Sequence, residues 1–357
     1  MTCAAAGGAT APRERSPGDG TGIPGGTGRL IGAADRHGYT RRAMDIASRL
    51  LSGDVRALAR AIRLVEDRDP AVEDLLREVR GRAGTAHVTG ITGPPGSGKS
   101  TVCDQLIERW RRAGHRVGVI AVDPSSPFSG GAILGDRVRM QRHTGDDGVF
   151  IRSMAARGHL GGLASAAREA VRLIDASGRD RCLLETVGVG QSELEVMETA
   201  DTTVVVTTPI AGDSVQIIKA GILEIADVFV VNKSDVPGAS KVVRELRDLV
   251  KQTKGTTVWR PPVVQTVGTT GEGIDELLEA IERHHDTIAQ SGELERRRRA
   301  RLRSEIAAIV VERAAERARQ ELEEGTMAGE LSGDLSGVDP YAFADRILNG
   351  HTGEPKR

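Results

Sequence analysis

A glycine-rich segment of the chain carries residues that could bind phosphate. It reads Gly93-Pro94-Pro95-Gly96-Ser97-Gly98-Lys99-Ser100-Thr101, which matches the pattern G-x-x-x-x-G-K-[ST]. Glycines let the backbone approach phosphate oxygens closely, and the backbone N–H groups and the following helix N-terminus face the anion. In this pattern Lys99 contacts the β- and γ-phosphates, and the hydroxyl of Ser100 binds Mg²⁺. A β-branched stretch before the segment, residues 88–92, and a helical stretch after it, residues 102–112, argue against a chance glycine-rich turn.

A second motif, Asn232-Lys233-Ser234-Asp235, follows the apolar stretch 228–231 and matches the guanine pattern N-K-x-D. The Asp235 carboxylate can accept two hydrogen bonds, from the N1–H and the 2-amino group of guanine. Adenine offers no such pair, and a site built for hydrogen bonds can reject an analogue lacking them by ~10⁴–10⁵. An ordinary surface turn is the alternative. After a phosphate loop and a strand, guanine binding is the stronger interpretation.

Acidic residues stand at the ends of two further apolar stretches. Glu185 ends the stretch 181–185 and is followed by Gly188. The carboxylate can hold Mg²⁺ directly or through water, and the Gly188 N–H can sense a γ-phosphate. Asp123 also ends an apolar stretch, and Asp136 lies further along the chain. We expect both to act on the Mg²⁺ side or to position water; a loop or capping carboxylate is the alternative for each.

Composition excludes several classes of protein. The chain has 357 residues, a formal net charge of -1 and 2% aromatic residues, so neither a nucleic-acid surface nor a base-stacking platform is expected. Cys103 and Cys182 are interpreted as core residues, and no disulfide framework or metal cluster is visible. No signal-peptide segment or apolar run long enough to span a bilayer is visible, so we expect a cytoplasmic protein that binds no membrane.

Apolar stretches alternate with helical ones between residues 88 and 281. Their near-continuous apolar character predicts strands buried on both faces of a mostly parallel sheet, flanked by helices, in an α/β fold. The predicted strands are residues 88–92, 117–122, 149–153, 181–185, 203–208, 228–231 and 263–267.

The two ends of the chain are expected to add helices to this core. Residues 40–51, a stretch from Asp54, and residues 70–79 show helical spacing of apolar residues. A long helix is predicted from about Gly292, and a final short helix is predicted from Asp339-Pro340 to about residue 349, after a loop over 325–337. We therefore divide the chain into a disordered tail (1–38), an N-terminal helical extension (39–84), a phosphate-loop domain (85–290) and a C-terminal helical dimerisation arm (291–350).

Three features in the last quarter of the chain need an interpretation. The long helix carries an apolar stripe that includes Leu302, Ile306 and Val310, which must be buried either in a dimer or against the domain. The arginine-rich run 296–301 is interpreted as a solvated helix face. The pair His284-His285 is interpreted as a surface pair near a helix end.

Taken together, these segments resemble the MeaB/ArgK/MMAA family of P-loop GTPases, the methylmalonyl-CoA mutase-associated GTPase chaperones. The likeness covers roughly residues 42–320. It is carried by the phosphate loop, the string D-P-S-S from Asp123, G-G-A-I-L-G-D ending at Asp136, G-H-L-G-G from Gly158, and N-K-S-D from Asn232. The string E-T-V-G-V-G-Q-S-E, which begins at Glu185, is the most specific of them.

The resemblance implies a fold, an activity and partners. The fold is a SIMIBI-type P-loop NTPase with helical N- and C-terminal extensions. The activity is hydrolysis of GTP to GDP and phosphate, in a chaperone for an adenosylcobalamin-dependent acyl-CoA mutase, usually methylmalonyl-CoA mutase. Such proteins gate cofactor loading by a cobalamin adenosyltransferase and protect or reactivate the mutase. The C-terminal arm forms a homodimer in this family.

The resemblance also implies roles for residues of this chain. Lys99, Asp123, Asp136 and Glu185 are the catalytic set, and Ser100, Asp123, Asp136 and Glu185 are the Mg²⁺ set. The residues predicted to bind the nucleotide are Gly93, Pro94, Pro95, Gly96, Ser97, Gly98, Lys99, Ser100, Thr101, Gly188, Asn232, Lys233, Asp235, Val267, Gly268 and Thr269.

Some positions depart from the family pattern. Ile210 stands where glycine is usual and Ser214 where an acidic residue is usual, in a segment expected to contact the mutase. Val267-Gly268-Thr269 replaces a Ser-Ala-Lys-like string, so the Gly268 N–H can still reach the guanine O6 but a serine hydroxyl is missing. Weaker nucleotide binding is the hypothesis that follows.

Two other function classes remain as alternatives. A metal-delivery GTPase of the nickel-chaperone type needs Cys/His clusters that this chain does not show. A kinase of the ArgK type would use the loop for phosphoryl transfer, but the N-K-x-D motif disfavours ATP as the donor. No residue that activates water is identified; Arg137, Arg139, Arg142 and Arg157 are candidate charges that could assist hydrolysis.

Overall fold

The computed structural model describes residues 33–123, 141–143, 145–155, 162–186, 188, 195, 197–209, 222–253, 258–323, 325–331 and 338–349. Its centre is a seven-stranded parallel sheet in the order β3-β2-β4-β1-β5-β6-β7. Each predicted strand is present: β1 (His87–Thr92), β2 (Val117–Asp123), β3 (Val149–Ala155), β4 (Arg181–Thr186), β5 (Thr202–Thr207), β6 (Val228–Asn232) and β7 (Val263–Thr266). The predicted α/β fold with a parallel sheet is therefore confirmed.

Strand order places β1 at the point where the chain changes direction across the sheet. β1 lies between β4 and β5, with β2 and β3 beyond β4 and with β6 and β7 beyond β5. In such sheets ligands bind outside the carboxyl ends of the strands, at this switch point. The register pairs Ile91 of β1 with Glu185 of β4 and with Val204 of β5, so the segments after these strands start side by side.

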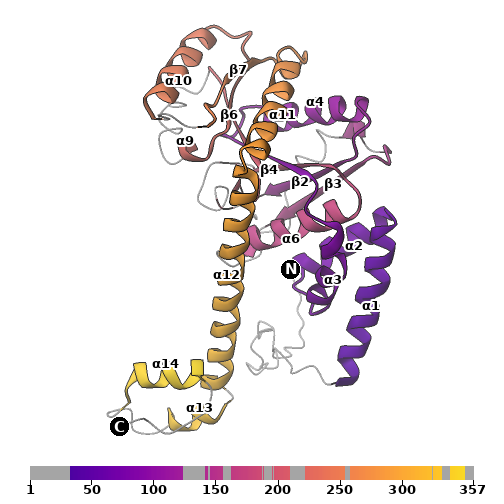
Figure 1. Cartoon of the computed structure of the whole chain (residues 1–357), viewed down its shortest axis with the longest axis vertical. Helices are drawn as coiled ribbons and strands as arrows, with labels where there is room; N and C mark the ends of the chain where they lie inside the picture. The colour runs from indigo at the N-terminus through magenta and orange to yellow at the C-terminus, as the bar shows by residue number, and fades with distance from the viewer. Residues whose placement is uncertain are drawn as a thin grey trace, which may run out of the picture.

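Helices cover both faces of the sheet (Figure 1). One face packs against α4 (Lys99–Arg112) and α11 (Ile274–Gln290), and the other against α6 (Gly162–Ala176) and α10 (Ala239–Thr253); the short α9 (Ile222–Ile225) precedes β6. Alternation along β4 shows the two faces, because Leu183 joins the core under α4 while Cys182 and Leu184 join the core under α6. Cys103 and Cys182 are both fully buried, as predicted.

Three N-terminal helices pack against α6: α1 (Ala33–Leu51), α2 (Val55–Glu66) and α3 (Ala71–Val79), followed by a 3-10 turn, η1 (Arg80–Arg82). Asp54 caps α2 by accepting hydrogen bonds from the N–H groups of Arg56 (2.8 Å) and Ala57 (3.1 Å). Residues 33–38, predicted to be disordered, form the first turns of α1, while the tail before them lies outside the described residues.

The C-terminal region is a long helix, α12 (Glu293–Glu323), that extends away from the sheet (Figure 1). Two short helices, α13 (Thr326–Glu330) and α14 (Pro340–Asn349), lie near its far end. The prediction of a loop over 325–337 is wrong for α13. This helix forms because it packs against α12 and buries Met327 completely, a tertiary contact without a local sequence signal.

Arginines in the first turns of α12 join this helix to the amino-terminal edge of the sheet. Arg298 and Arg301 form ion pairs with Asp201, at 2.7 Å and 3.0 Å, and Arg297 pairs with Asp227 at 3.3 Å. Both carboxylates are buried. The interpretation of the run as a solvated face is therefore wrong for these three side chains, because each has a buried partner far away in sequence.

A buried polar cluster adjoins these ion pairs. His284 is fully buried, and its ring contacts Thr202 Oγ1 (2.9 Å) and Asp227 Oδ1 (3.2 Å). The surface interpretation is therefore wrong for His284, and the neighbouring His285 stacks on His87 of β1 with ring centroids 4.0 Å apart. The pair fills the space between α11 and the strand starts.

We predict that Asp201→Asn destabilises the protein by ~3 kcal/mol at pH 7, because two arginines lose a buried charged partner. Burial alone would raise the pKa of Asp201, but the hydrogen bond from Arg298 and the charges of Arg298 and Arg301 outweigh burial and lower this pKa. A carboxyl group with a lowered pKa stabilises the fold above its unfolded pKa and loses this effect as pH falls. Urea unfolding should therefore show a smaller difference from wild type below about pH 4 than at pH 7.

Glu279→Gln serves as the control, since Glu279 forms a solvent-exposed pair with Arg283 and should change stability little at either pH. An equal loss in both variants would contradict the assignment to Asp201.

Candidate nucleotide-binding site

The loop after β1, residues 93–98, has space only for glycine at two positions. Gly93 has φ +145°, and a Cβ there would lie 2.0 Å from the backbone oxygen of Val206 in β5. Gly98 has φ +89°, and a Cβ there would lie 2.3 Å from Nδ2 of Asn232. Real Cβ atoms do not approach other atoms so closely, and both φ values disfavour other residues. Glycine therefore lets the loop pass against β5 and against the end of β6.

Lys99 is the first residue of α4 and is buried. Its Nζ donates hydrogen bonds to the carbonyl oxygens of Gly93 (2.9 Å) and Pro94 (3.1 Å). The ammonium group is thus held inside the curve of the loop, next to the N-terminus of the helix. A cation and a helix N-terminus in one loop both favour a bound anion.

Ser100 and Glu185 bring a hydroxyl and a carboxylate together beside the loop. Ser100 Oγ donates to Glu185 Oε1 at 2.6 Å, and both residues are buried. These hard oxygen donors are of the kind that Mg²⁺ prefers, and Mg²⁺ usually takes only one or two protein groups along with phosphate oxygens. Within the described residues no group of three or more His, Cys, Asp or Glu side chains could hold a metal.

The other two predicted Mg²⁺ residues are described only in part. The backbone of Asp123 ends β2, one residue after Val122 pairs with Thr186 of β4, which puts Asp123 on the same edge as Glu185. Its side chain and the whole of Asp136 lie outside the described residues.

Gly188 is tied to the ends of β1 and β4. Thr92 Oγ1 donates to the carbonyl oxygen of Gly188 at 2.9 Å, and Thr186 Oγ1 contacts Thr92 Oγ1 at 2.9 Å. This places Gly188 beside the start of the phosphate loop. Sequence reasoning missed both threonines; their only signal is a hydroxyl at the last residue of each strand.

Asn232 joins the phosphate loop to the loop after β7. Its Nδ2 donates to the carbonyl oxygen of Ser97 (2.8 Å), and its Oδ1 accepts from the N–H of Gly268 (3.0 Å) and from Thr266 Oγ1 (3.1 Å). Lys233 adopts a left-handed conformation with φ +58°. Its Nζ donates to the carbonyl oxygen of Gly96 at 2.9 Å, so the N-K-x-D segment holds the phosphate loop from one side.

The remaining base-side residues lie around this junction. Asp235 and Thr269 are exposed, Val267 is buried, and the backbone of Gly268 packs against Thr101 of α4. The exposed carboxylate of Asp235 follows directly on the two residues that hold the phosphate loop, so it can reach a bound base from solvent. The structure thus brings together residues 93–101, Glu185, Gly188 and the segments 232–235 and 267–269 on one edge of the sheet.

Several sequence-predicted residues do not join this group. Arg142 forms ion pairs with Asp104 (2.6 Å) and Glu108 (3.0 Å) on α4, so its charge is already paired. Arg137, Arg139, Arg157, Ile210 and Ser214 lie outside the described residues.

We predict that Asn232→Ala costs at least about 2 kcal/mol of unfolding free energy, because Ser97 and Gly268 each lose the partner of a buried backbone group. Thr266→Val is the matched variant, since it removes only one of the hydrogen bonds that Asn232 accepts. Urea unfolding of both variants measures the difference. A loss in Asn232→Ala no larger than in Thr266→Val would show that Asn232 is not the main link between the loops.

Comparison with known proteins agrees with this geometry. The family model described as "Methylmalonyl Co-A mutase-associated GTPase MeaB" matches residues 58–323. A Pyrococcus horikoshii protein whose name describes it as a GTPase is 48% identical over 312 residues, covering 87% of this chain and 98% of that protein. The GTPase ArgK of Escherichia coli is 38% identical over 255 residues, covering 69% of this chain and 77% of that protein.

A solved structure has the same fold. The crystal structure of a LAO/AO transport system kinase superposes with a TM-score of 0.61 at 28% sequence identity, covering 90% of this chain and 98% of that chain. The matched segment of the family model runs from α2 to the end of α12 and so contains the whole site. The chain belongs to the MeaB family and is a P-loop GTPase that binds GTP and GDP.

Proposed function

We propose that the protein is a GTPase chaperone of an adenosylcobalamin-dependent acyl-CoA mutase, with methylmalonyl-CoA mutase as the client. The observation that carries this proposal is the match to the MeaB family model, whose description names that mutase, over residues 58–323. In this function GTP hydrolysis gates cofactor loading from a cobalamin adenosyltransferase and protects or reactivates the mutase. The cytoplasmic location expected from the sequence stays a prediction.

The site residues are assigned to this reaction as follows. The loop 93–101 would surround the phosphates with its N–H groups, and Lys99 would neutralise charge on the β- and γ-oxygens. Asp235 would bind the guanine edge, while Asn232 and Lys233 hold the loops in register. Gly268, predicted to offer its N–H to the guanine O6, donates that N–H to Asn232 Oδ1 here, so it would reach the base only if this hydrogen bond is exchanged. Val267 and Thr269 complete the proposed base-side loop.

Ser100 and Glu185 fit a Mg²⁺ site, and we include Asp123 and Asp136 in it. When bound, Mg²⁺ would offset the charge of the phosphate oxygens. Gly188, held by Thr92 at the end of β1, would present its N–H to the γ-phosphate and sense its loss. Water attacks the γ-phosphorus in line, and no described residue is assigned as its base.

The division of the chain proposed here follows these roles. Residues 85–290 form the GTPase domain, residues 39–84 an N-terminal helical extension and residues 291–350 the C-terminal arm, with α1 extending the helical part back to Ala33. Of the segment 1–38, which the sequence predicts to be a disordered tail, we keep the part before Ala33 as the proposed tail.

The test is nucleotide turnover with and without purified methylmalonyl-CoA mutase. GTP is expected to be hydrolysed much faster than ATP, and the mutase is expected to raise the GTPase rate or change its own cofactor loading. Lys99→Ala should lower turnover at least about a hundredfold, because a charge that stabilises the reacting phosphate is removed.

Lys251→Ala, which removes an exposed lysine of α10, is the control and should leave turnover unchanged. Circular dichroism establishes that both variants fold. Preference for ATP would favour the kinase alternative, and a mutase that changes neither rate nor loading would refute the chaperone role.

We also propose that α12 forms a homodimer. Leu302, Ile306, Ile309 and Val310 are between 39% and 60% exposed and follow one side of the helix. The side next to them faces the core, where Glu305 is buried against Arg172 at 2.7 Å. The exposure of the stripe supports contact with a second copy, which would supply a matching apolar stripe, rather than packing against the described part of its own chain.

Ile306→Lys is predicted to convert the dimer to a monomer, because a lysine would be buried in the apolar contact. Sedimentation equilibrium measures the mass. Val311→Lys is the control: this exposed residue lies about 140° further around the helix, so the dimer should persist. A wild-type monomer, or a monomer in both variants, would contradict the proposed interface.

A further inference from the structure

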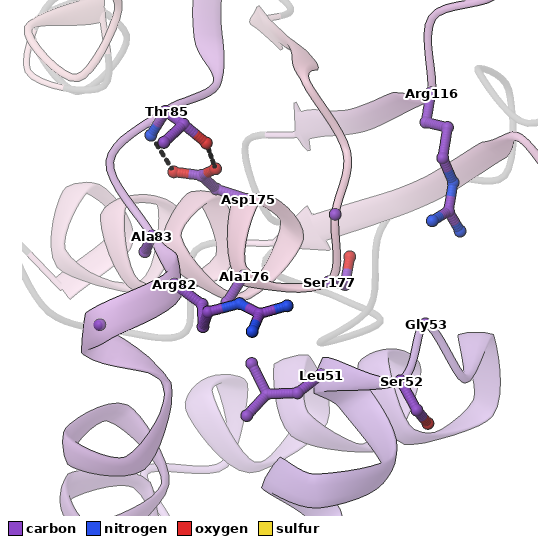
Figure 2. Close-up of a pocket in the computed structure, with 12 residues that line it drawn as sticks. Leu51, Ser52, Gly53, Arg82, Ala83, Thr85, Arg116, Asp175, Ala176 and Ser177 are labelled. Atoms are coloured by element: carbon purple, nitrogen blue, oxygen red, sulfur yellow. Dashed lines mark hydrogen bonds between the residues drawn. The ribbon is translucent and has the colours of Figure 1, made fainter.

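A cavity of about 470 Å³ lies away from the nucleotide site, where the N-terminal helices meet the GTPase domain. Its walls come from the turn between α1 and α2 (residues 51–53), the segment 81–85 before β1, the start of β2 and the end of α6. Figure 2 shows the guanidinium groups of Arg82 and Arg116 directed into the space between the α1–α2 turn and the end of α6. No part of the proposed GTPase mechanism uses this cavity.

Arg116 is held between two tight turns. Cβ atoms built on Gly53 and Gly178 would lie 3.5 Å and 3.4 Å from its terminal nitrogens, so the guanidinium sits against both backbones. Both glycines have φ above +80°, which keeps side chains out of this space. Within the described structure neither Arg82 nor Arg116 makes an ion pair. By contrast, Arg49, Arg111 and Arg181 are each paired with a carboxylate.

A third arginine stands behind the cavity wall. Arg179 is 1% exposed, and its Nη1 donates a hydrogen bond to Ser177 Oγ at 2.7 Å. Its guanidinium lies over the ring of Phe150, 5.4 Å from the centroid, and its Nε and Nη2 have no hydrogen-bond partner in the described structure. Ser177 lines the cavity. Burial, and to a smaller extent the nearby charge of Arg116, lower the pKa of Arg179 to about 10.

The negative groups at this place do not balance these charges. Asp175 lines the cavity, but its carboxylate already accepts from the N–H groups of Thr85 (3.0 Å) and Ala86 (3.1 Å) and from Thr85 Oγ1 (3.0 Å), as Figure 2 shows in part. Helices α1 and α6 also end at this cavity, and the dipole of each helix places roughly half a negative charge at its C-terminus. Counted against the Asp175 carboxylate and these two helix ends, the three arginines leave an excess of roughly one positive charge around the cavity.

We propose that this cavity binds a small organic phosphate, with the phosphate dianion held by Arg116 and Arg82 and the organic part lying toward Leu51 and Ala83. Guanidinium groups suit phosphate because their planar N–H donors match its oxygens. A ligand bound there joins the α1–α2 turn to the start of β2 and the end of α6. It would therefore stiffen the packing of the N-terminal helices on the GTPase domain.

The experiment uses the full chain saturated with GDP and Mg²⁺, so that the phosphate loop is already filled. Isothermal titration calorimetry with glycerol 3-phosphate, and separately with inorganic phosphate, is expected to show saturable binding of one ligand per chain. Sodium acetate at matched ionic strength tests whether a carboxylate is enough. Stronger binding of glycerol 3-phosphate than of inorganic phosphate would support the organic part; equal binding or carboxylate binding would overturn this ligand class.

Arg116→Gln and Arg82→Gln are each expected to weaken glycerol 3-phosphate binding at least about tenfold, as loss of a charged hydrogen bond does. Arg283→Gln, on the exposed side of α11, is the control and should bind as wild type does. Arg82 is exposed, so its variant keeps the test valid if Arg116→Gln fails to fold. No saturable binding to GDP-loaded wild type, or unchanged affinity in the folded arginine variants, would overturn the proposal while leaving the GTPase assignment intact.

Discussion

The side-chain amide of Asn232 holds the nucleotide site together, because it bonds at once to the phosphate loop and to the loop after β7. An amide is suited to this position since it is both donor and acceptor, and here each function meets a backbone group that would otherwise be buried without a partner. The contact works only because Gly98 has no Cβ at the point where Asn232 approaches the loop. The phosphate loop and the proposed base-side loop are therefore held together by one side chain.

The opposite edge of the sheet, at the amino-terminal ends of the strands, attaches the long helix α12. There Asp201 and Asp227 are buried carboxylates whose charges are met by arginines from α12, with His284 and Thr202 filling the polar space behind them. Charged hydrogen bonds fix direction as well as distance, so they set the angle at which the long helix leaves the domain. The candidate nucleotide site and the attachment of α12 thus occupy opposite ends of the strands, which leaves the apolar stripe of α12 open for contact.

The N-terminal helices are attached in a third way. Their apolar faces share one core with α6, but the border between the layers contains an unbalanced group of arginines around a cavity. Apolar contacts stabilise this packing without specifying what fills the border. Arg82 and Arg116 make no ion pair in the described structure, so stability alone does not account for their place at this border, and this is the observation behind the proposed anion site.

The sequence by itself determined the strands, the phosphate loop and the N-K-x-D segment, because apolar runs and glycine spacing are local signals that survive without a fold. It could not predict that the arginine-rich run binds Asp201 and Asp227, that His284 is buried, or that α13 is a helix. Each of these depends on a partner far away in the chain. The threonines that tie Gly188 to β1 were missed for the same reason. Only the tertiary structure decides which charges are paired and which remain exposed, since pairing depends on distance in space and not on spacing along the chain.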